Sequence, residues 1–116
     1  MNKIYYLASC DTCRKTIKSL PKDNNLVFHD IKQNLITEIE LEEMHQLSGS
    51  YEALFSKKAQ LYKSMDLKNK SLTESDFKKY ILEHYTFLSR PVFIIDGKIY
   101  IGNSQKNVAE VIKVLS

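Results

Sequence analysis

The fold is decided by residues 4–19, which read IYYLASCDTCRKTIKS. Residues 3–8 are rich in β-forming side chains and predict a central, parallel strand, whereas the basic segment after Cys13 has helical character. Cys10 and Cys13 lie between them with Cys-x-x-Cys spacing, and they are the only cysteines of the chain. This stretch therefore predicts a strand, a redox-active turn and a helix that ends before Pro21.

The composition is typical of one globular domain of 116 residues. Hydrophobic residues make up 43% of the chain and charged residues 27%, which argues against disorder, and no apolar run is long enough to span a membrane. No export signal is recognisable, so we expect a cytoplasmic location, where paired thiols indicate redox catalysis rather than a structural disulfide.

The charge balance gives little reason to expect a polyanionic partner. The net charge is +3, and most lysines are interspersed with acids. A lysine cluster is interpreted as a solvated helical face; it comprises Lys57, Lys58, Lys63, Lys68 and Lys70. We therefore expect no direct nucleic-acid binding and no membrane binding, and we expect a monomer.

The middle of the chain predicts helices. After a second strand at residues 26–31, Thr37 and Thr73 each open a capping-box pattern, and Gly49 is a natural helix end. Ser50 is expected to cap a further short helix. Apolar side chains at helical spacing predict the buried faces: Leu41, Met44, Leu47, Tyr51, Leu54, Phe55, Phe77, Tyr80, Ile81 and Tyr85.

The end of the chain predicts a hairpin and a helix. Asp96-Gly97 separates two apolar runs, residues 92–95 and 98–101, and this dipeptide is a strong signal for a two-residue hairpin. A last helix follows, capped by Asn103 or Ser104, with an apolar stripe formed by Val108, Ala109, Val111, Ile112 and Leu115.

The order of these elements predicts an α/β fold. The pattern β-α-β, helices, β-β-α, with Cys-x-x-Cys after the first strand, is that of a thioredoxin-like core with a mixed sheet and an all-helical insertion. We expect a single domain over residues 1–116, with the core at about residues 1–33 and 89–116 and the insertion at about 34–88.

The Cys turn is the candidate reactive site. A cysteine at the N-terminal end of a helix has a lowered pKa, so Cys10 is expected to be the nucleophile, with Arg14 adding positive charge and Asp11 opposing it. Cys13 lies one helical turn on and is expected to resolve the product; alternatively it is a buried small hydrophobe. A zinc site is not expected, because the three histidines supply no second ligand pair at suitable spacing.

Arg90-Pro91 is the second candidate feature. The residues before the third strand of such a core lie against the Cys turn, so the Arg90 guanidinium could hold an anion beside the thiolate. Spacing alone favours a surface arginine before an ordinary trans proline.

The chain resembles the ArsC/Spx/YffB family over essentially its whole length. The likeness is carried by Ser-Cys-Asp-Thr-Cys-Arg-Lys at residues 9–15, Ser-Arg-Pro-Val at residues 89–92, and the helical stretch between them. The resemblance implies a thioredoxin-like fold, a nucleophile at Cys10, an anion-binding Arg90 and a proline, Pro91, that is typically cis. It also implies arsenate reductase-like enzymatic activity, with glutathione as co-substrate and glutaredoxin or thioredoxin as partners, and no bound cofactor.

The match to the arsenate-reducing branch is incomplete. That branch uses three arginines around the oxyanion, and only Arg90 is matched here; the other two positions fall at Ser56, beside Lys57 and Lys58, and near Gly102. We therefore expect a thiol-dependent oxidoreductase whose substrate is open, with arsenate disfavoured by the unmatched arginines. Cys10, Cys13 and Arg90 are expected to be catalytic, and Arg14, Arg90 and Pro91 to bind substrate.

The alternative is a redox-sensing regulator. Cys-x-x-Cys also resembles the Spx branch, in which the pair is a switch on a protein that binds the RNA polymerase α subunit. Gly49 lies near the position of a glycine at that contact, although its role as a helix end explains it equally well.

Overall fold

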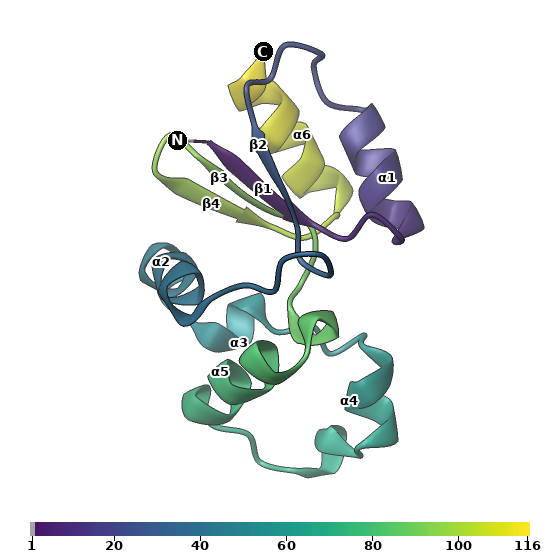
Figure 1. Cartoon of the computed structure of the whole chain (residues 1–116), viewed down its shortest axis with the longest axis vertical. Coiled ribbons are helices and arrows are strands. Elements are labelled where there is room, and N and C mark those ends of the chain that lie inside the picture. The colour runs from purple at the N-terminus through teal and green to yellow at the C-terminus, as the bar shows by residue number, and fades with distance from the viewer. Residues whose placement is uncertain (1) are drawn as a thin grey trace. The chain divides into compact units, whose positions relative to one another are not determined.

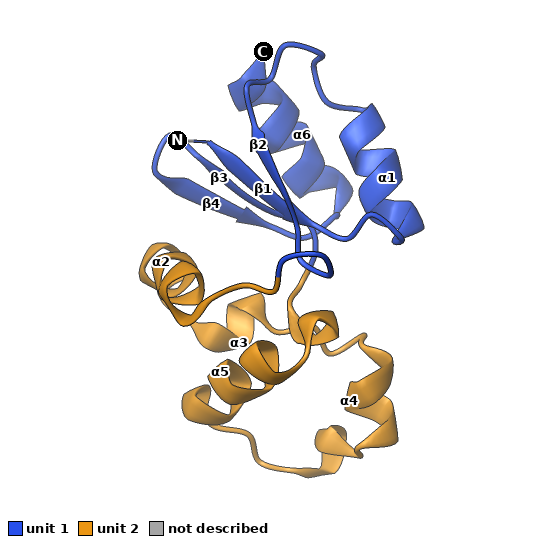
Figure 2. Ribbon diagram, viewed as in Figure 1, with its two compact units in different colours: residues 1–34, 90–116 blue, residues 35–89 orange. Residues whose placement is uncertain are grey.

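A computed structural model of the chain describes residues 2–116. The chain divides into two compact units (Figure 2). The first comprises residues 1–34 and 90–116, and the second comprises residues 35–89. All of the candidate site residues lie in the first unit.

The first unit is a four-stranded mixed sheet with two helices, α1 and α6 (Figure 1). The strand order is β2-β1-β3-β4, with β1 parallel to β2 and antiparallel to β3. This arrangement confirms the predicted α/β class and the β-α-β, β-β-α order. The strands and helices are β1 (Lys3–Tyr6), α1 (Asp11–Lys18), β2 (Val27–Asp30), β3 (Val92–Ile95), β4 (Lys98–Ile101) and α6 (Gln105–Leu115).

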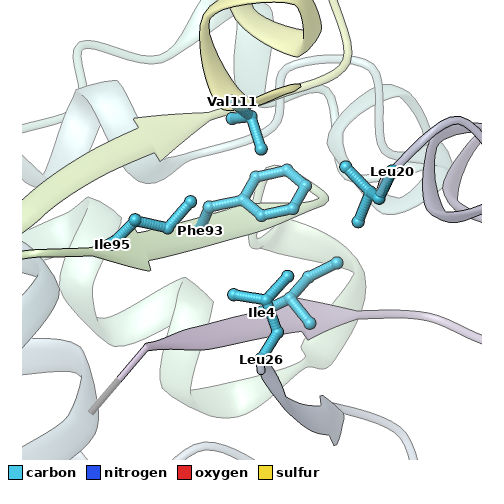
Figure 3. Close-up of a cluster of buried hydrophobic side chains, with 6 residues drawn as sticks. All are labelled: Ile4, Leu20, Leu26, Phe93, Ile95 and Val111. Carbon is cyan, nitrogen blue, oxygen red and sulfur yellow. The ribbon is translucent and has the colours of Figure 1, made fainter. Parts of the chain in front are cut away.

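A buried cluster joins the sheet to both helices (Figure 3). Ile4 and Phe93 are paired across β1 and β3, so their side chains share one face of the sheet, and both are fully buried. Val111 of α6 and Leu20 after α1 cover this face. The packing fixes α1, and with it the Cys turn, against the sheet.

The β3–β4 hairpin is confirmed with the predicted turn. Asp96 and Gly97 both have positive φ, 50° and 77°, which is the backbone that a two-residue turn of this type requires. Ser104, rather than Asn103, caps α6 by accepting a hydrogen bond from the Asn107 N–H.

The second unit consists of short helices, most of which begin with a side-chain cap. Thr37 and Thr73 form the predicted capping boxes, Ser50 caps α3, and Gly49 ends α2 in the left-handed conformation. The elements are α2 (Glu38–Ser48), α3 (Tyr51–Leu54), α4 (Gln60–Ser64), η1 (Leu67–Asn69), α5 (Glu74–Glu83) and η2 (Tyr85–Phe87).

Two apolar residues were predicted wrongly to lie on the buried face of their helix. Leu47 is 38% exposed, because Leu41 and Met44 already fill the inward face of α2 and Leu47 lies outside it. Ala109 of α6 is likewise exposed, whereas Val111 is fully buried. The predicted strands were also too long at their ends, since β1 stops at Tyr6 and β2 starts at Val27.

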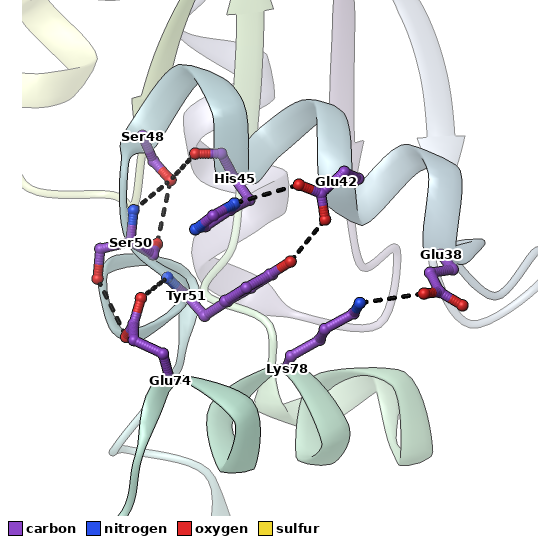
Figure 4. Close-up of polar contacts among 8 residues, drawn as sticks. All are labelled: Glu38, Glu42, His45, Ser48, Ser50, Tyr51, Glu74 and Lys78. Atoms are coloured by element: carbon purple, nitrogen blue, oxygen red, sulfur yellow. Dashed lines mark hydrogen bonds and ion pairs between the residues drawn. The ribbon is translucent and has the colours of Figure 1, made fainter.

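A polar network ties α2, α3 and α5 together within the second unit (Figure 4). The rings of His45 and Tyr51 stack with their centroids 3.9 Å apart, and the Tyr51 hydroxyl donates to Glu42 at 2.6 Å. The Glu74 carboxylate accepts hydrogen bonds from the backbone N–H groups of Tyr51 and Glu52, at 2.8 and 3.0 Å. Glu74 therefore caps the N-terminus of α3 from a different helix.

Glu74→Gln is expected to lower the free energy of unfolding by about 1 kcal/mol, because the amide loses the charge that strengthens both hydrogen bonds and keeps one acceptor oxygen. Denaturant unfolding measures the change. Glu83→Gln is the matched control, since this exposed residue of α5 forms a long, solvent-exposed ion pair with Lys79 at 3.9 Å. Equal effects from the two substitutions would contradict the capping role.

Candidate functional site

The Cys turn is built by the end of β1 and the start of α1. The chain turns after β1, where the Cys10 N–H donates to the Leu7 carbonyl at 3.0 Å. Cys10 has extended backbone angles and is the N-cap residue of α1. Cys13 lies one turn into the helix, is fully buried, and both cysteines are free thiols. The turn thus places a half-buried thiol at a helix N-terminus above a buried one.

The pKa of Cys10 lies below its usual value. Burial raises this pKa, but the backbone N–H and the thiol of Cys13, the N–H of Thr12 and the charge of Arg90 together lower it by more. This direction agrees with the one expected for a cysteine at a helix N-terminus.

The pKa of Cys13 is shifted the other way, to about 11. Burial is the main cause, and the neighbouring Cys10 sulfur raises the pKa further by its charge and by accepting the hydrogen bond from the Cys13 thiol. The Leu7 N–H and the Arg90 charge partly offset these effects. Cys13 therefore stays protonated while Cys10 ionises, and its proton stabilises the Cys10 thiolate.

Arg90 and Pro91 are brought to the Cys turn by the sheet. Val92 of β3 pairs with Tyr5 of β1, so the residues just before β3 lie beside the end of β1 where the turn begins. The charge of Arg90 lowers the pKa of both cysteines. The Arg90–Pro91 peptide bond is cis, and the Pro91 carbonyl accepts a hydrogen bond from the Gly102 N–H at 2.8 Å.

Arg14 has a different environment from the one expected of a substrate-binding residue. Its guanidinium forms an ion pair with the Asp11 carboxylate and donates to the Ala8 carbonyl at 3.1 Å. Substrate binding by Arg14 remains a prediction. Asp11, expected to oppose the thiolate, is the partner of this arginine.

Sequence reasoning missed the backbone groups at the site. The N–H groups of Thr12 and Leu7 act on Cys10 and Cys13 respectively, and no side-chain motif reveals them. The spacing of Asp11 and Arg14, three residues apart, does favour their ion pair on a helix.

Within residues 2–116, no three or more His, Cys, Asp or Glu side chains gather as a group that could hold a metal ion. The part of the chain that the structure describes also has no helix long and apolar enough to cross a membrane. Ser56, Lys57 and Lys58 belong to the second unit.

Comparison with known proteins identifies the family. The model of the ArsC family matches residues 5–111, which include the Cys turn, Arg90-Pro91 and the helices between them. The chain belongs to the ArsC family. This confirms the resemblance inferred from the sequence motifs.

Relatives within the ArsC family differ in their described functions. The chain is 27% identical over 109 residues to the global transcriptional regulator Spx 2 of Bacillus anthracis, covering 90% of this chain and 82% of the regulator. It is 26% identical over 114 residues to an arsenate reductase of Haemophilus influenzae, covering 94% and 97% of the two chains. A Bacteroides fragilis protein described as ArsC family related has a similar fold, with a TM-score of 0.80, 20% identity and coverage of 95% and 97%.

The two cysteines should differ strongly in reactivity. Thiolates react and thiols do not, and the pKa of Cys13 is raised to about 11 whereas that of Cys10 is lowered. At neutral pH we expect iodoacetamide to modify Cys10 at least about 100-fold faster than Cys13. Residue-resolved mass spectrometry measures both rates, and in urea the two rates should converge. Equal rates in the folded protein would contradict the assigned ionisation.

Proposed function

We propose that the protein is a cytoplasmic, thiol-dependent oxidoreductase of the ArsC type, with Cys10 as the nucleophile. The observation that carries this proposal is the placement of the free Cys10 thiol at the N-cap of α1, one turn from the buried Cys13 thiol. The pKa of Cys10 is lowered and that of Cys13 is raised, with the Cys13 thiol hydrogen-bonded to Cys10. An activated thiolate beside a protonated thiol is the arrangement that a dithiol exchange reaction needs.

The reaction proceeds by two exchanges. The Cys10 thiolate attacks one sulfur of a substrate disulfide, which forms a mixed disulfide and releases the other sulfur as a thiolate. Cys13 then loses its proton and attacks Cys10 Sγ, which releases the second substrate thiolate and leaves a Cys10–Cys13 disulfide. Two glutathione molecules, or a glutaredoxin or thioredoxin dithiol, reduce this disulfide and are themselves oxidised. Alternatively, glutathione resolves the mixed disulfide directly.

Formation of the mixed disulfide changes the ionisation of Cys13. The negative Cys10 sulfur, which raises the Cys13 pKa, becomes neutral when it bonds to the substrate. Arg90, whose charge lowers that pKa, is unchanged. The pKa of Cys13 therefore falls at the step where Cys13 must act, so the resolving thiol is activated only after the first exchange.

Arg90 is assigned to anion binding beside Cys10. The Arg90 charge acts on the sulfurs of Cys10 and Cys13. The carboxylate of an anionic disulfide could therefore contact the guanidinium while a sulfur of the same disulfide is attacked by the Cys10 thiolate. The relative described as an arsenate reductase is 26% identical, but two of the three arginines expected around arsenate are not matched here. Thiol exchange therefore fits the residues better than arsenate reduction.

The test compares an anionic with a neutral disulfide in a glutathione-coupled turnover assay. Arg90→Lys keeps the charge but cannot form a planar two-point contact, so we expect kcat/KM to fall about 10-fold for the anionic disulfide and much less for the neutral one. Lys98→Gln, an exposed charge on β4, is the control. No turnover of either disulfide by the wild type would refute the oxidoreductase function, and equal losses would refute anion binding.

A redox-sensing regulator is the second candidate. It is favoured by the 27% identity to the regulator Spx 2 over 90% of this chain, together with the Cys10–Cys13 pair. In that case oxidation of the pair would change binding to the RNA polymerase α subunit without turnover. Capture of purified α subunit by oxidised but not reduced protein, with no disulfide turnover, would favour this candidate.

A further inference from the structure

Arg14 lies across the turn that carries the nucleophile. Its Nη1 donates to the Ala8 carbonyl at 3.1 Å, and its Nη2 forms the ion pair with the Asp11 carboxylate. Its backbone N–H donates to the Cys10 carbonyl at 3.1 Å. Arg14 therefore bonds to Ala8 before the nucleophile, to Cys10 itself and to Asp11 after it.

Backbone hydrogen bonds hold Cys10 on both sides. Its carbonyl accepts from the Arg14 N–H, and its own N–H donates to the Leu7 carbonyl at 3.0 Å. The guanidinium adds a second connection between the segment that precedes Cys10 and the first turn of α1. Loss of the guanidinium would remove the hydrogen bond that joins the Ala8 carbonyl to that first turn.

The ion pair also has an electrostatic effect on Cys10. The Asp11 carboxylate follows the nucleophile directly, and an unpaired negative charge there would disfavour the thiolate. The Arg14 guanidinium neutralises that charge. Because Asp11 is 80% exposed and Arg14 54% exposed, solvent screens both charges and the effect should be modest.

We propose that Arg14 is a positioning residue for Cys10, which tethers the Cys turn to α1 and neutralises Asp11, and that it does not contact the substrate. The inference goes beyond the proposed oxidoreductase function and rests on it only in taking Cys10 as the nucleophile. It also replaces substrate binding as the role of Arg14.

The electrostatic half is tested by the pH dependence of Cys10 alkylation, followed by residue-resolved mass spectrometry. In Arg14→Gln the unpaired Asp11 should raise the midpoint by about half a pH unit. Asp11→Asn alone should not raise it, and the double variant should return to about the wild-type midpoint. Lys15→Gln removes a neighbouring exposed charge of α1 and is the matched control for a nonspecific loss of positive charge.

The tethering half is tested at a pH where Cys10 is fully ionised. There Arg14→Gln and the double variant should both react with a neutral disulfide about 5-fold more slowly than the wild type, because a loosened turn positions the thiolate less well. Arg14→Lys should keep the wild-type midpoint, because it keeps a charge beside Asp11. Arg14→Lys should nevertheless react with the disulfide as slowly as Arg14→Gln, because a single ammonium group cannot contact the Ala8 carbonyl and the Asp11 carboxylate as the guanidinium does.

A substrate-contact role would give a different result. An unchanged alkylation midpoint in Arg14→Gln, with a raised KM for an anionic disulfide only, would overturn the proposal. So would a double variant that keeps the raised midpoint. The Cys10 titration needs no turnover, so failure of the oxidoreductase function itself would appear separately, as absent turnover in a protein whose Cys10 still titrates as expected.

Discussion

Cys10→Ser should abolish disulfide turnover, with a loss of at least about 1,000-fold in kcat/KM. The serine hydroxyl has a far higher pKa than a thiol, so the N–H groups of Thr12 and Cys13 and the charge of Arg90 cannot generate its anion near neutral pH. A coupled assay with glutathione and a small disulfide measures the loss. The fold should remain, because Cys10 is only half-buried and makes no side-chain cap.

The matched control for this prediction is Cys13→Ser. That variant keeps the Cys10 nucleophile and should still form a mixed disulfide, although its Cys10 pKa should rise because the thiol that donates to Cys10 is replaced by a weaker acid. Circular dichroism checks that both variants are folded. Unchanged turnover in Cys10→Ser would rule out the mechanism, whichever substrate is used.

Phe93→Ala should destabilise the protein by about 3–5 kcal/mol. Phe93 is fully buried in β3, where it contacts the cluster formed with Ile4, Leu20 and Val111. Its removal leaves a cavity between the sheet and both helices. The surrounding side chains belong to three different elements and cannot easily move together to fill it. Because domains of this size are stable by only about 5–15 kcal/mol, the variant should be close to unfolding at ambient temperature.

The measurement is denaturant unfolding followed by circular dichroism. Val114→Ala is the control, since this side chain of α6 is 40% exposed and its truncation should change stability by no more than about 0.5 kcal/mol. If Phe93→Ala and Val114→Ala were equally stable, the cluster in Figure 3 would not be the core that holds α1 and α6 to the sheet.

The elements of the fold were predictable because their signals are local. Thr37, Thr73 and Asp96-Gly97 each specify a helix start or a hairpin through contacts within four residues, and all three are confirmed. The strand ends and the exposure of Leu47 depend on how elements pack. β1 ends at Tyr6 because the following residues form the turn that leads to Cys10, and no periodicity in the sequence marks where this turn begins.

The site was predictable to a smaller extent. Cys10 and Cys13 are three residues apart, so their proximity follows from helical spacing. Arg90 is eighty residues away from Cys10. Only the expected thioredoxin-like core and the family resemblance linked it to the thiols, and the pairing of β1 with β3 brings it beside the Cys turn. The opposite pKa shifts depend on burial and on individual N–H groups, which a sequence does not contain.

Trapping the first intermediate tests the central claim most directly. Cys13→Ser protein is mixed with oxidised glutathione, and the adduct is located by peptide mass spectrometry. The account predicts one glutathione per chain on Cys10, formed faster as the pH rises through the lowered Cys10 pKa and released by added reduced glutathione. Absence of an adduct on Cys10, under conditions that fully modify free cysteine, would contradict its role as the nucleophile.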